Sequence, residues 1–267
     1  VDGNGQGDGP VEPGSPIEVP VGDRHGVPAG ASAAVLNVTA VNTGGAGFLT
    51  VFPCDQDKPW ASNVNFVTTG EITPNLVVSK LSADGSICLD AGVSPTDVVV
   101  DLIGFFPAVA DYVALNPGRL LDTRSGGDTV DGDGSGAGKP PVGERVVLQV
   151  ADRHGIPADA AAAVLNVTIT EPDAPGYVTA WPCDVDQPNA SNLNYVREGQ
   201  NRPNVVVSKL SADGTVCLVA EPASTHIVVD VAGYFPAPEE PTEPTPTTTT
   251  TTTVPGATTT TTTPTPG

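Results

Sequence analysis

The chain has 267 residues, with 11 lysines and arginines against 31 aspartates and glutamates, a formal charge of −20 at pH 7. Nucleic acids and anionic membranes bind clustered basic side chains, so this balance argues against both as partners. No apolar run reaches the ~20 residues of a membrane helix, so we expect no membrane insertion. The length suits two domains of ordinary size.

The first 15 residues form a glycine- and aspartate-rich segment, and predicted strands of a first repeat occupy residues 16–109. The strand segments are rich in Val, Ile, Thr and aromatic residues, and glycines and prolines separate them. In chain order they are Ile17–Val21, Ala34–Val41, Gly47–Phe52, Ala61–Phe66, Asn75–Leu81, Ser86–Asp90 and Asp97–Phe106. No window sustains the apolar spacing of an amphipathic helix.

Residues 110–129 form a linking segment with the phrase YVALNPGRLLDTRSGGD, which occurs once, and residues 130–237 repeat the first part of the chain. Val1 falls on Val130, and a constant shift of 129 residues continues without a gap to Ala108 on Ala237. AAVLNVT is identical in both copies, and PNLVVSKLSADGSICL meets PNVVVSKLSADGTVCL. Two copies with a single linking segment predict that this segment completes one copy, while the other stays incomplete until another molecule supplies a strand.

Residues 238–267 are rich in threonine and proline and cannot bury enough apolar surface to offset the entropy of ordering. Thr with Pro is the signature of an O-glycosylated stalk, and an unmodified linker is the alternative. The candidate O-glycosylation sites are Thr247, Thr248, Thr249, Thr250, Thr251, Thr252, Thr253, Thr258, Thr259, Thr260, Thr261, Thr262 and Thr263. The fold class predicted for the whole chain is all-β, with two tandem β-sandwich domains of jelly-roll or immunoglobulin-like type before a disordered or glycosylated Thr/Pro-rich tail.

The cysteines form one pair in each copy at the same spacing, Cys54 with Cys88 and Cys183 with Cys217. An even, duplicated set predicts one disulfide per copy and an oxidising compartment, and so a secreted protein of the cell exterior. A metal site is the competing interpretation, but no histidine lies at ligand spacing.

Two aspartates, Asp101 and Asp230, interrupt the apolar strands VVVDL and VVVDV, and a buried carboxylate needs a partner. The candidate partners are Lys80, Lys209, Arg119 and Arg124. We expect a structural ion pair in each copy and no catalytic role.

The histidines His25 and His154 lie in DRHG phrases that read as tight turns, with acid–base chemistry as the alternative. The third, His226, aligns with Asp97, so the copies share no role for it. No nucleophile elbow or paired-carboxylate motif accompanies them. The sequence therefore predicts no catalytic residues and a protein that is not an enzyme.

Aspartate and asparagine alternate with glycine at Asp2 and Asn4, and aspartates do so at Asp131 and Asp133 of the second copy. Such oxygen ligands resemble the first half of a calcium loop, although the glutamate at the twelfth position of an EF-hand is missing. A flexible Asp/Gly linker explains the pattern equally well. Calcium is the candidate metal, and covalent glycans are the other expected group.

The N-glycosylation pattern occurs at Asn37, Asn166 and Asn189. The first two lie in predicted strands, which disfavours modification. Asn189 follows Pro188 in a predicted loop and is the better candidate.

Taken together, RLLDTR, AAAAVLNVT, GYVTAWPC, ASNLNY, PNVVVSKLSADGTVCL and THIVVDVAGYF resemble a repeat domain of secreted, mostly actinobacterial surface proteins. The resemblance covers nearly everything before the tail. It implies an extracellular, non-catalytic module of poorly defined biochemical role, and it carries over no site residues. The first copy departs from the pattern because no RLLDTR precedes it.

These observations predict a structural subunit of an extracellular fibre or stalk, a homopolymer joined head-to-tail by strand complementation. The expected donor is residues Tyr112–Arg124 of a neighbour or part of its Thr-rich tail. The alternative is an adhesion module that binds cell-wall or surface glycans. Aromatic residues make up only 4% of the chain, and Trp60 and Trp181 do not align, which disfavours a repeated sugar platform.

Overall fold

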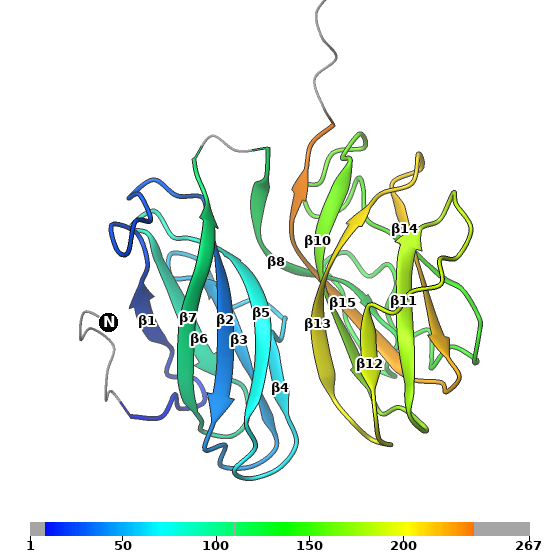
Figure 1. The fold of residues 1–267 in the computed structure, drawn as a ribbon, viewed down its shortest axis with the longest axis horizontal. Helices are drawn as coiled ribbons and strands as arrows, with labels where there is room; N and C mark the ends of the chain where they lie inside the picture. Colours follow the sequence, from blue (N-terminus) through cyan, green and yellow to red (C-terminus); the bar gives the residue numbers. More distant parts are fainter. Residues whose placement is uncertain (1–8, 109–110, 238–267) are drawn as a thin grey trace, which may run out of the picture. The chain divides into compact units, whose positions relative to one another are not determined.

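The computed structural model describes residues 9–108, here called repeat 1, and residues 111–237, here called repeat 2. These residues form strands, turns and irregular segments (Figure 1). Because the described ranges contain no helix, they hold none that is long and apolar enough to cross a membrane. The all-β prediction is confirmed for this part of the chain.

Repeat 1 contains seven strands, whose bounds agree closely with the predicted segments. They are β1 (Ile17–Pro20), β2 (Ala33–Val41), β3 (Gly47–Pro53), β4 (Val64–Phe66), β5 (Thr73–Lys80), β6 (Ser86–Ala91) and β7 (Asp97–Phe106). The exception is the segment predicted at Ala61–Phe66, of which only the last three residues are strand. In its first half side chains replace ladder bonds: the Thr50 hydroxyl donates to the Ala61 carbonyl. The Asn63 side chain accepts from the Val51 amide.

Repeat 2 has the same seven strands and one more before them. The additional strand is β8 (Val113–Asp122), and the others are β9 (Val146–Gln149), β10 (Ala162–Thr170), β11 (Gly176–Pro182), β12 (Leu193–Tyr195), β13 (Arg202–Lys209), β14 (Thr215–Glu221) and β15 (His226–Phe235). Strand β8 comes from the linking segment that the sequence shows only once. It pairs with β15 of repeat 2.

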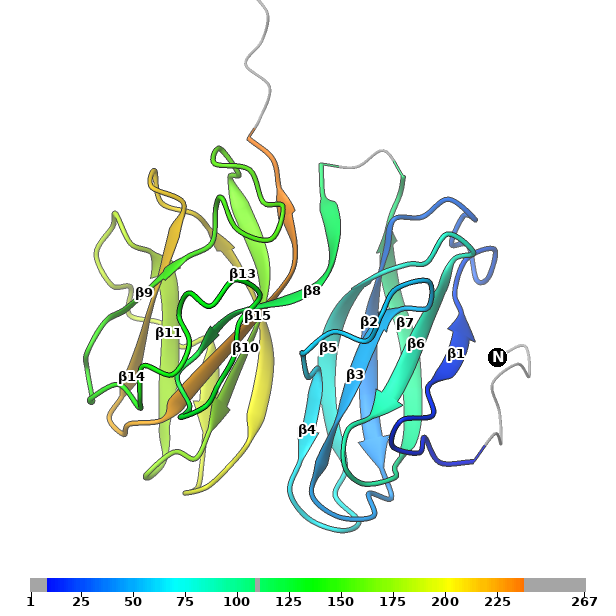
Figure 2. The same ribbon diagram turned by 180° about the vertical axis from the view of Figure 1, so that it is seen from behind.

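The strands of each repeat form two antiparallel sheets. In repeat 2 the orders are β13-β10-β15-β8 and β12-β11-β14-β9, and Figure 2 shows the second sheet from behind. Every connection except that from β11 to β12 crosses between the two sheets, which is the arrangement of a jelly roll and not of an immunoglobulin domain. Repeat 1 has the same orders, β5-β2-β7 and β1-β6-β3-β4, but its first sheet ends at β7.

Each repeat encloses its own hydrophobic core. In repeat 1 side chains such as Leu36, Leu49 and Phe66 are almost completely buried, and in repeat 2 Leu148 and Leu165 are. The inward residues alternate with more exposed ones along β2, as the period-two pattern of a half-buried strand requires. These cores account for the Val- and Leu-rich strand segments of the sequence.

One disulfide lies in each repeat, as the duplicated cysteine pairs predict. Cys54 is bonded to Cys88 with a Cα–Cα distance of 4.9 Å, and Cys183 to Cys217 with 5.0 Å. Each bond connects residues 34 apart in sequence, which corresponds to roughly 3.5–4 kcal/mol of stabilisation in the chain-entropy model.

The two repeats also contact each other. The Tyr112 ring lies 4.2 Å from that of Phe106 and 5.2 Å from that of Phe235, measured between centroids. The Asn166 side-chain amide donates a 2.7 Å hydrogen bond to the Ser62 carbonyl. Because of these contacts, the described residues up to Ala237 form one compact unit.

We expect amide hydrogen exchange to distinguish β7 from β15. The amides of β15 that donate to β8 should be protected, whereas the amides of β7 on the side away from β2 should exchange rapidly, since the described residues place no strand there. Exchange followed by NMR or mass spectrometry measures this. Strands β2 and β10, paired on both sides, are the internal controls, and equal protection of β7 and β15 would contradict the open edge.

Candidate functional site

The candidate site is the edge of the sheet in repeat 1, and the way β8 covers the same edge in repeat 2 shows how it is built. Strand β8 pairs antiparallel with β15, and Arg119 lies opposite Asp230. The pairing has irregularities on both sides of this residue pair. Leu120 and Leu121 of β8 enter the core with 0% and 3% exposure. Strand β8 therefore supplies both apolar side chains and a charge to its acceptor.

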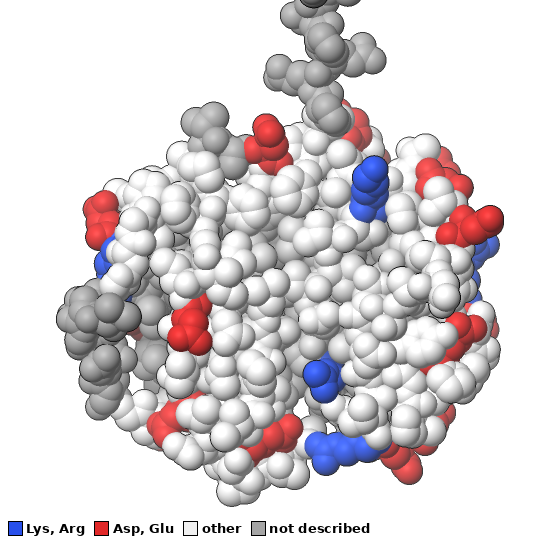
Figure 3. All heavy atoms as spheres, in the orientation of Figure 1, with Lys and Arg blue, Asp and Glu red and all other residues white. Residues whose placement is uncertain are grey.

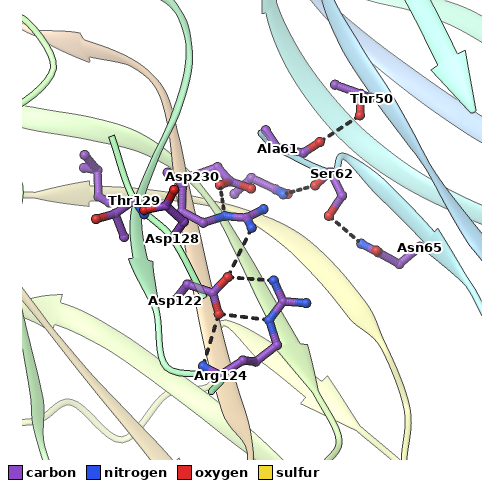
Figure 4. A network of polar contacts seen from close by, with 12 residues as sticks. Thr50, Ala61, Ser62, Asn65, Asp122, Arg124, Asp128, Thr129 and Asp230 are labelled. Carbon is purple, nitrogen blue, oxygen red and sulfur yellow. Dashed lines mark hydrogen bonds and ion pairs between the residues drawn. The ribbon is translucent and has the colours of Figure 1, made fainter. Parts of the chain in front are cut away.

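A network of four charged side chains holds β8 in place (Figure 4). The Arg119 guanidinium donates to Asp230 at 2.9 Å and to Asp122 at 3.2 Å. The Arg124 guanidinium donates to Asp122 at 2.6 Å. Of the partners expected for Asp230, the structure selects Arg119 and not Lys209, which is exposed.

Burial and charge act in opposite directions on the two carboxyls. Burial raises the pKa of Asp230, and the Arg119 charge opposes this rise without cancelling it. Burial also acts to raise the pKa of Asp122, but the hydrogen bonds and charge of Arg124, with the charge of Arg119, outweigh it and hold that pKa below its usual value. The hydrogen bond to Asp122 in turn raises the pKa of Arg124. Asp122 is therefore the ionised centre of the network.

The DRHG turn of repeat 2 clamps the backbone of β8, a role that the sequence analysis missed. Arg153, only 7% exposed, donates to the Leu120 carbonyl at 2.9 Å and to the Gln149 carbonyl at 3.0 Å. It also donates to both carboxylate oxygens of Asp131, at 2.6 and 2.8 Å. The arginine thus ties together β8, the end of β9 and the loop that follows β8.

His154 makes the second contact of this turn. Its Nε2 lies 2.8 Å from the Asn116 carbonyl oxygen, and because a carbonyl only accepts, Nε2 carries the proton. The imidazole ring packs where a Cβ on Gly118 would come within 2.5 Å of it, so glycine is required at this point of β8. The turn reading is confirmed by positive φ angles of 60° at Asp152 and 50° at His154.

The calcium candidates of repeat 2 lie in the loop clamped by Arg153. The Arg153 hydrogen bonds and charge lower the pKa of Asp131, and the Asp133 amide donates to the same carboxylate. A cation at Asp131 has to compete with this ion pair. Asp2 and Asn4 lie outside the described residues, and calcium binding stays a prediction.

In repeat 1 the acceptor edge is present, but the described residues contain no counterpart of β8. Val98, Val100 and Leu102 line the inner face of β7 and are only partly buried. Their counterparts in β15 are completely buried, since Leu120 and Leu121 cover that end of the core: these counterparts are Ile227, Val229 and Val231. The lower burial of these three β7 side chains therefore follows from the lack of a counterpart of β8 among the described residues.

The outer face of β7 is also exposed. Val99 is 47% and Ile103 60% exposed, whereas Val228, the counterpart of Val99, is 3% exposed. Asp101 is exposed and lies within 3.3 Å of the Asn37 side-chain amide, while its counterpart Asp230 is 2% exposed. In repeat 2 both β8 and the contact with repeat 1 contribute to this burial.

The DRHG turn of repeat 1 has the same backbone as that of repeat 2. Asp23 and His25 have φ angles of 58° and 48°, and Arg24 donates to the Pro20 carbonyl at 2.7 Å, as Arg153 does to Gln149. The turn that holds β8 in repeat 2 thus has a counterpart of the same backbone in repeat 1. Only the structure shows that the DRHG turn of repeat 2 contacts β8, because the turn and the RLLDTR segment are far apart in the sequence.

The remaining sequence candidates lie apart from this edge. Asn189 is exposed in the loop after β11, which is compatible with modification, whereas Asn166 is buried between the repeats. The threonines proposed for O-glycosylation, Thr247–Thr253 and Thr258–Thr263, lie outside the described residues. On the face drawn in Figure 3 acidic side chains are dispersed and uncharged ones cover most of the surface.

We expect Asp122→Asn to destabilise repeat 2, because it leaves Arg119 and Arg124 beside a neutral amide. Removing one partner of a buried charge pair costs about 3 kcal/mol. Since the pKa of Asp122 is lowered in the folded state, the stabilisation is present above the unfolded pKa and is lost as the pH falls through the folded pKa. Urea denaturation should therefore show a large difference at pH 6–7 that shrinks below about pH 4. A difference independent of pH would contradict an ionised Asp122.

Comparison with known proteins adds no family to this description. No protein-family model matches the sequence, and no curated protein is significantly similar to it. The open β7 edge, with its covered counterpart in the same chain, is therefore the feature from which function is inferred.

Proposed function

We propose that the chain is a non-enzymatic structural protein, a subunit of an extracellular fibre or stalk in which neighbours are joined head-to-tail by strand addition at the β7 edge. The observation that carries the proposal is the contrast between β7 and β15. They are the same strand of two copies of one fold, and among the strands that the structure describes only β15 of these two is paired on both sides.

An open edge of this kind recruits another strand. Its free backbone groups pair with an extended segment, and side-chain pockets select that segment. Donor and acceptor are different surfaces, so the contact is heterologous and extends into a filament unless it closes into a ring. The partly buried inner valines of β7 add apolar surface that a donor strand would cover.

An extracellular setting agrees with the covalent structure. Disulfides persist in oxidising compartments, and each repeat has one. A glycosylated Thr/Pro segment suits a stalk because dense glycans stiffen and extend it. The resemblance to secreted surface repeats supports the same setting.

Of the two donor segments expected from the sequence, the pairing of β8 argues against the first. Residues 113–122 are already paired with β15 of their own chain. Exchange of this strand between copies fills one edge and opens another, so it provides no net pairing for growth. Within residues 1–267 the Thr-rich tail is then the remaining donor for a homopolymer, and otherwise the donor strand comes from outside these residues.

The function is tested by placing charges on the edge in cells that produce the protein. We expect Val99→Lys/Ile103→Lys to prevent strand addition, because lysines on an edge strand oppose pairing. Immunogold labelling in negative-stain microscopy should find the wild-type chain in surface fibres and the variant in the medium.

The matched control is Val185→Lys/Val196→Lys, which changes two exposed valines outside the strands. This control should stay in the fibres. Absence of the wild-type chain from any fibre, or retention of the edge variant there, would overturn the proposal.

Glycan binding is the second candidate, favoured by an open groove of about 610 Å³ in repeat 2. Tyr177 and Glu221 line it beside Asn189, and the Tyr177 hydroxyl donates to Glu221 at 3.3 Å. Trp60, in the position equivalent to Asn189, is 87% exposed, so repeat 1 presents a different surface. Binding of the purified chain on a glycan array, lost in Tyr177→Ala, would favour this function.

A further inference from the structure

We infer that the β7 edge is a receptor for an arginine-bearing strand of the RLLDTR type, other than the one that is already paired with β15. This inference rests on the proposed strand addition and specifies its donor. The geometry of β8 on β15 can be applied to β7, since the two acceptor strands have the same length and the same register with their common neighbour, β10 or β2.

The charge at the centre of the edge selects the donor. Applied to β7, the pairing of β8 with β15 places a donor arginine, in the position of Arg119, opposite Asp101. Asp101 is exposed and therefore accessible to a donor arginine. A hydrogen bond between two ionised groups is about twice as strong as one between neutral groups, so it discriminates among donors as well as attracting them.

The apolar side of the edge fits the same donor. Three inner side chains of β7 pack against the core of repeat 1 but are only partly buried: Val98, Val100 and Leu102. In repeat 2 two consecutive leucines of β8 complete the corresponding surface. A donor with leucines next to its arginine would bury these residues, and this is the composition of the RLLDTR segment.

The turn that clamps β8 in repeat 2 has a counterpart in repeat 1. The DRHG turn of repeat 1 adopts the backbone that positions Arg153 and His154 on β8 in repeat 2. A donor with glycine at the position of Gly118 leaves room for the histidine ring. The acceptor therefore matches the RLLDTR segment in charge, apolar surface and backbone.

Other occupants fit less well. Antiparallel pairing of two β7 strands around their centres brings Asp101 of each copy near that of the other, and like charges on facing strands are destabilising. The two longest proline-free runs of the tail, 247–254 and 256–263, contain neither arginine nor leucine. Because β8 is already paired with β15, the donor is a further strand of this type.

The test uses the purified full chain and a labelled synthetic peptide with the sequence of residues 111–126. We expect the peptide to bind, to raise the thermal stability of the chain and to protect the β7 amides from hydrogen exchange. Asp101→Asn in the protein, or Arg119→Ala in the peptide, should each weaken binding about tenfold or more, and the two changes together should cost little more than either alone.

Two controls make the result specific. Asp84→Asn, in the exposed turn between β5 and β6, should leave the affinity unchanged. A peptide with the sequence of residues 245–256 should not compete. Failure of the 111–126 peptide to bind, binding insensitive to Asp101→Asn, or binding of the tail peptide instead would overturn the inference.

The outcomes also separate this inference from the proposed function. Peptide binding that depends on Asp101, in a protein absent from native fibres, would retain the receptor and refute the fibre. Fibres that depend on β7, with no binding of the arginine-bearing peptide, would retain the fibre and refute this donor.

Discussion

The structure depends on a constraint of β-sheets: an edge strand has backbone groups and one row of core side chains that only another strand can cover. In repeat 2 strand β8 meets this requirement, and the pair of Arg119 with Asp230 sets its position at a buried point of the sheet. Asp122 then holds both arginines of RLLDTR, so the charges are compensated where burial makes an unpaired charge costly.

Repeat 1 shows what the same fold looks like without that strand. The hydrophobic core is formed, the disulfide is in place and the DRHG turn has the same backbone, yet Asp101 and the inner residues of β7 stay partly or fully exposed. The edge is therefore preformed. Because the acceptor is already ordered, binding of a donor strand would lose little conformational entropy on the acceptor side. The groups that select the donor would already be in position.

This asymmetry connects the fold to the proposed assembly function. One chain contains a complete acceptor–donor pair and one acceptor that its described residues leave open. Such a unit is suited to an assembly in which its open edge receives a strand from outside the described residues. An arginine-bearing donor would also explain why Asp101 lies among apolar residues at the centre of this edge strand.

Much of the fold follows from the sequence alone. The Val-rich segments between Gly and Pro turns locate the strands to within a few residues, because alternating burial is a local property. The duplicated cysteine pairs predict both disulfides, and the single RLLDTR predicts that one copy lacks a strand. Only the tertiary structure decides that β8 belongs to repeat 2, that Arg119 and not Lys209 neutralises Asp230, and that Arg153 and His154 clamp β8. These contacts join residues from about 30 to more than 100 positions apart, and strand pairing at such distances depends on the packing of whole sheets, which no local pattern records.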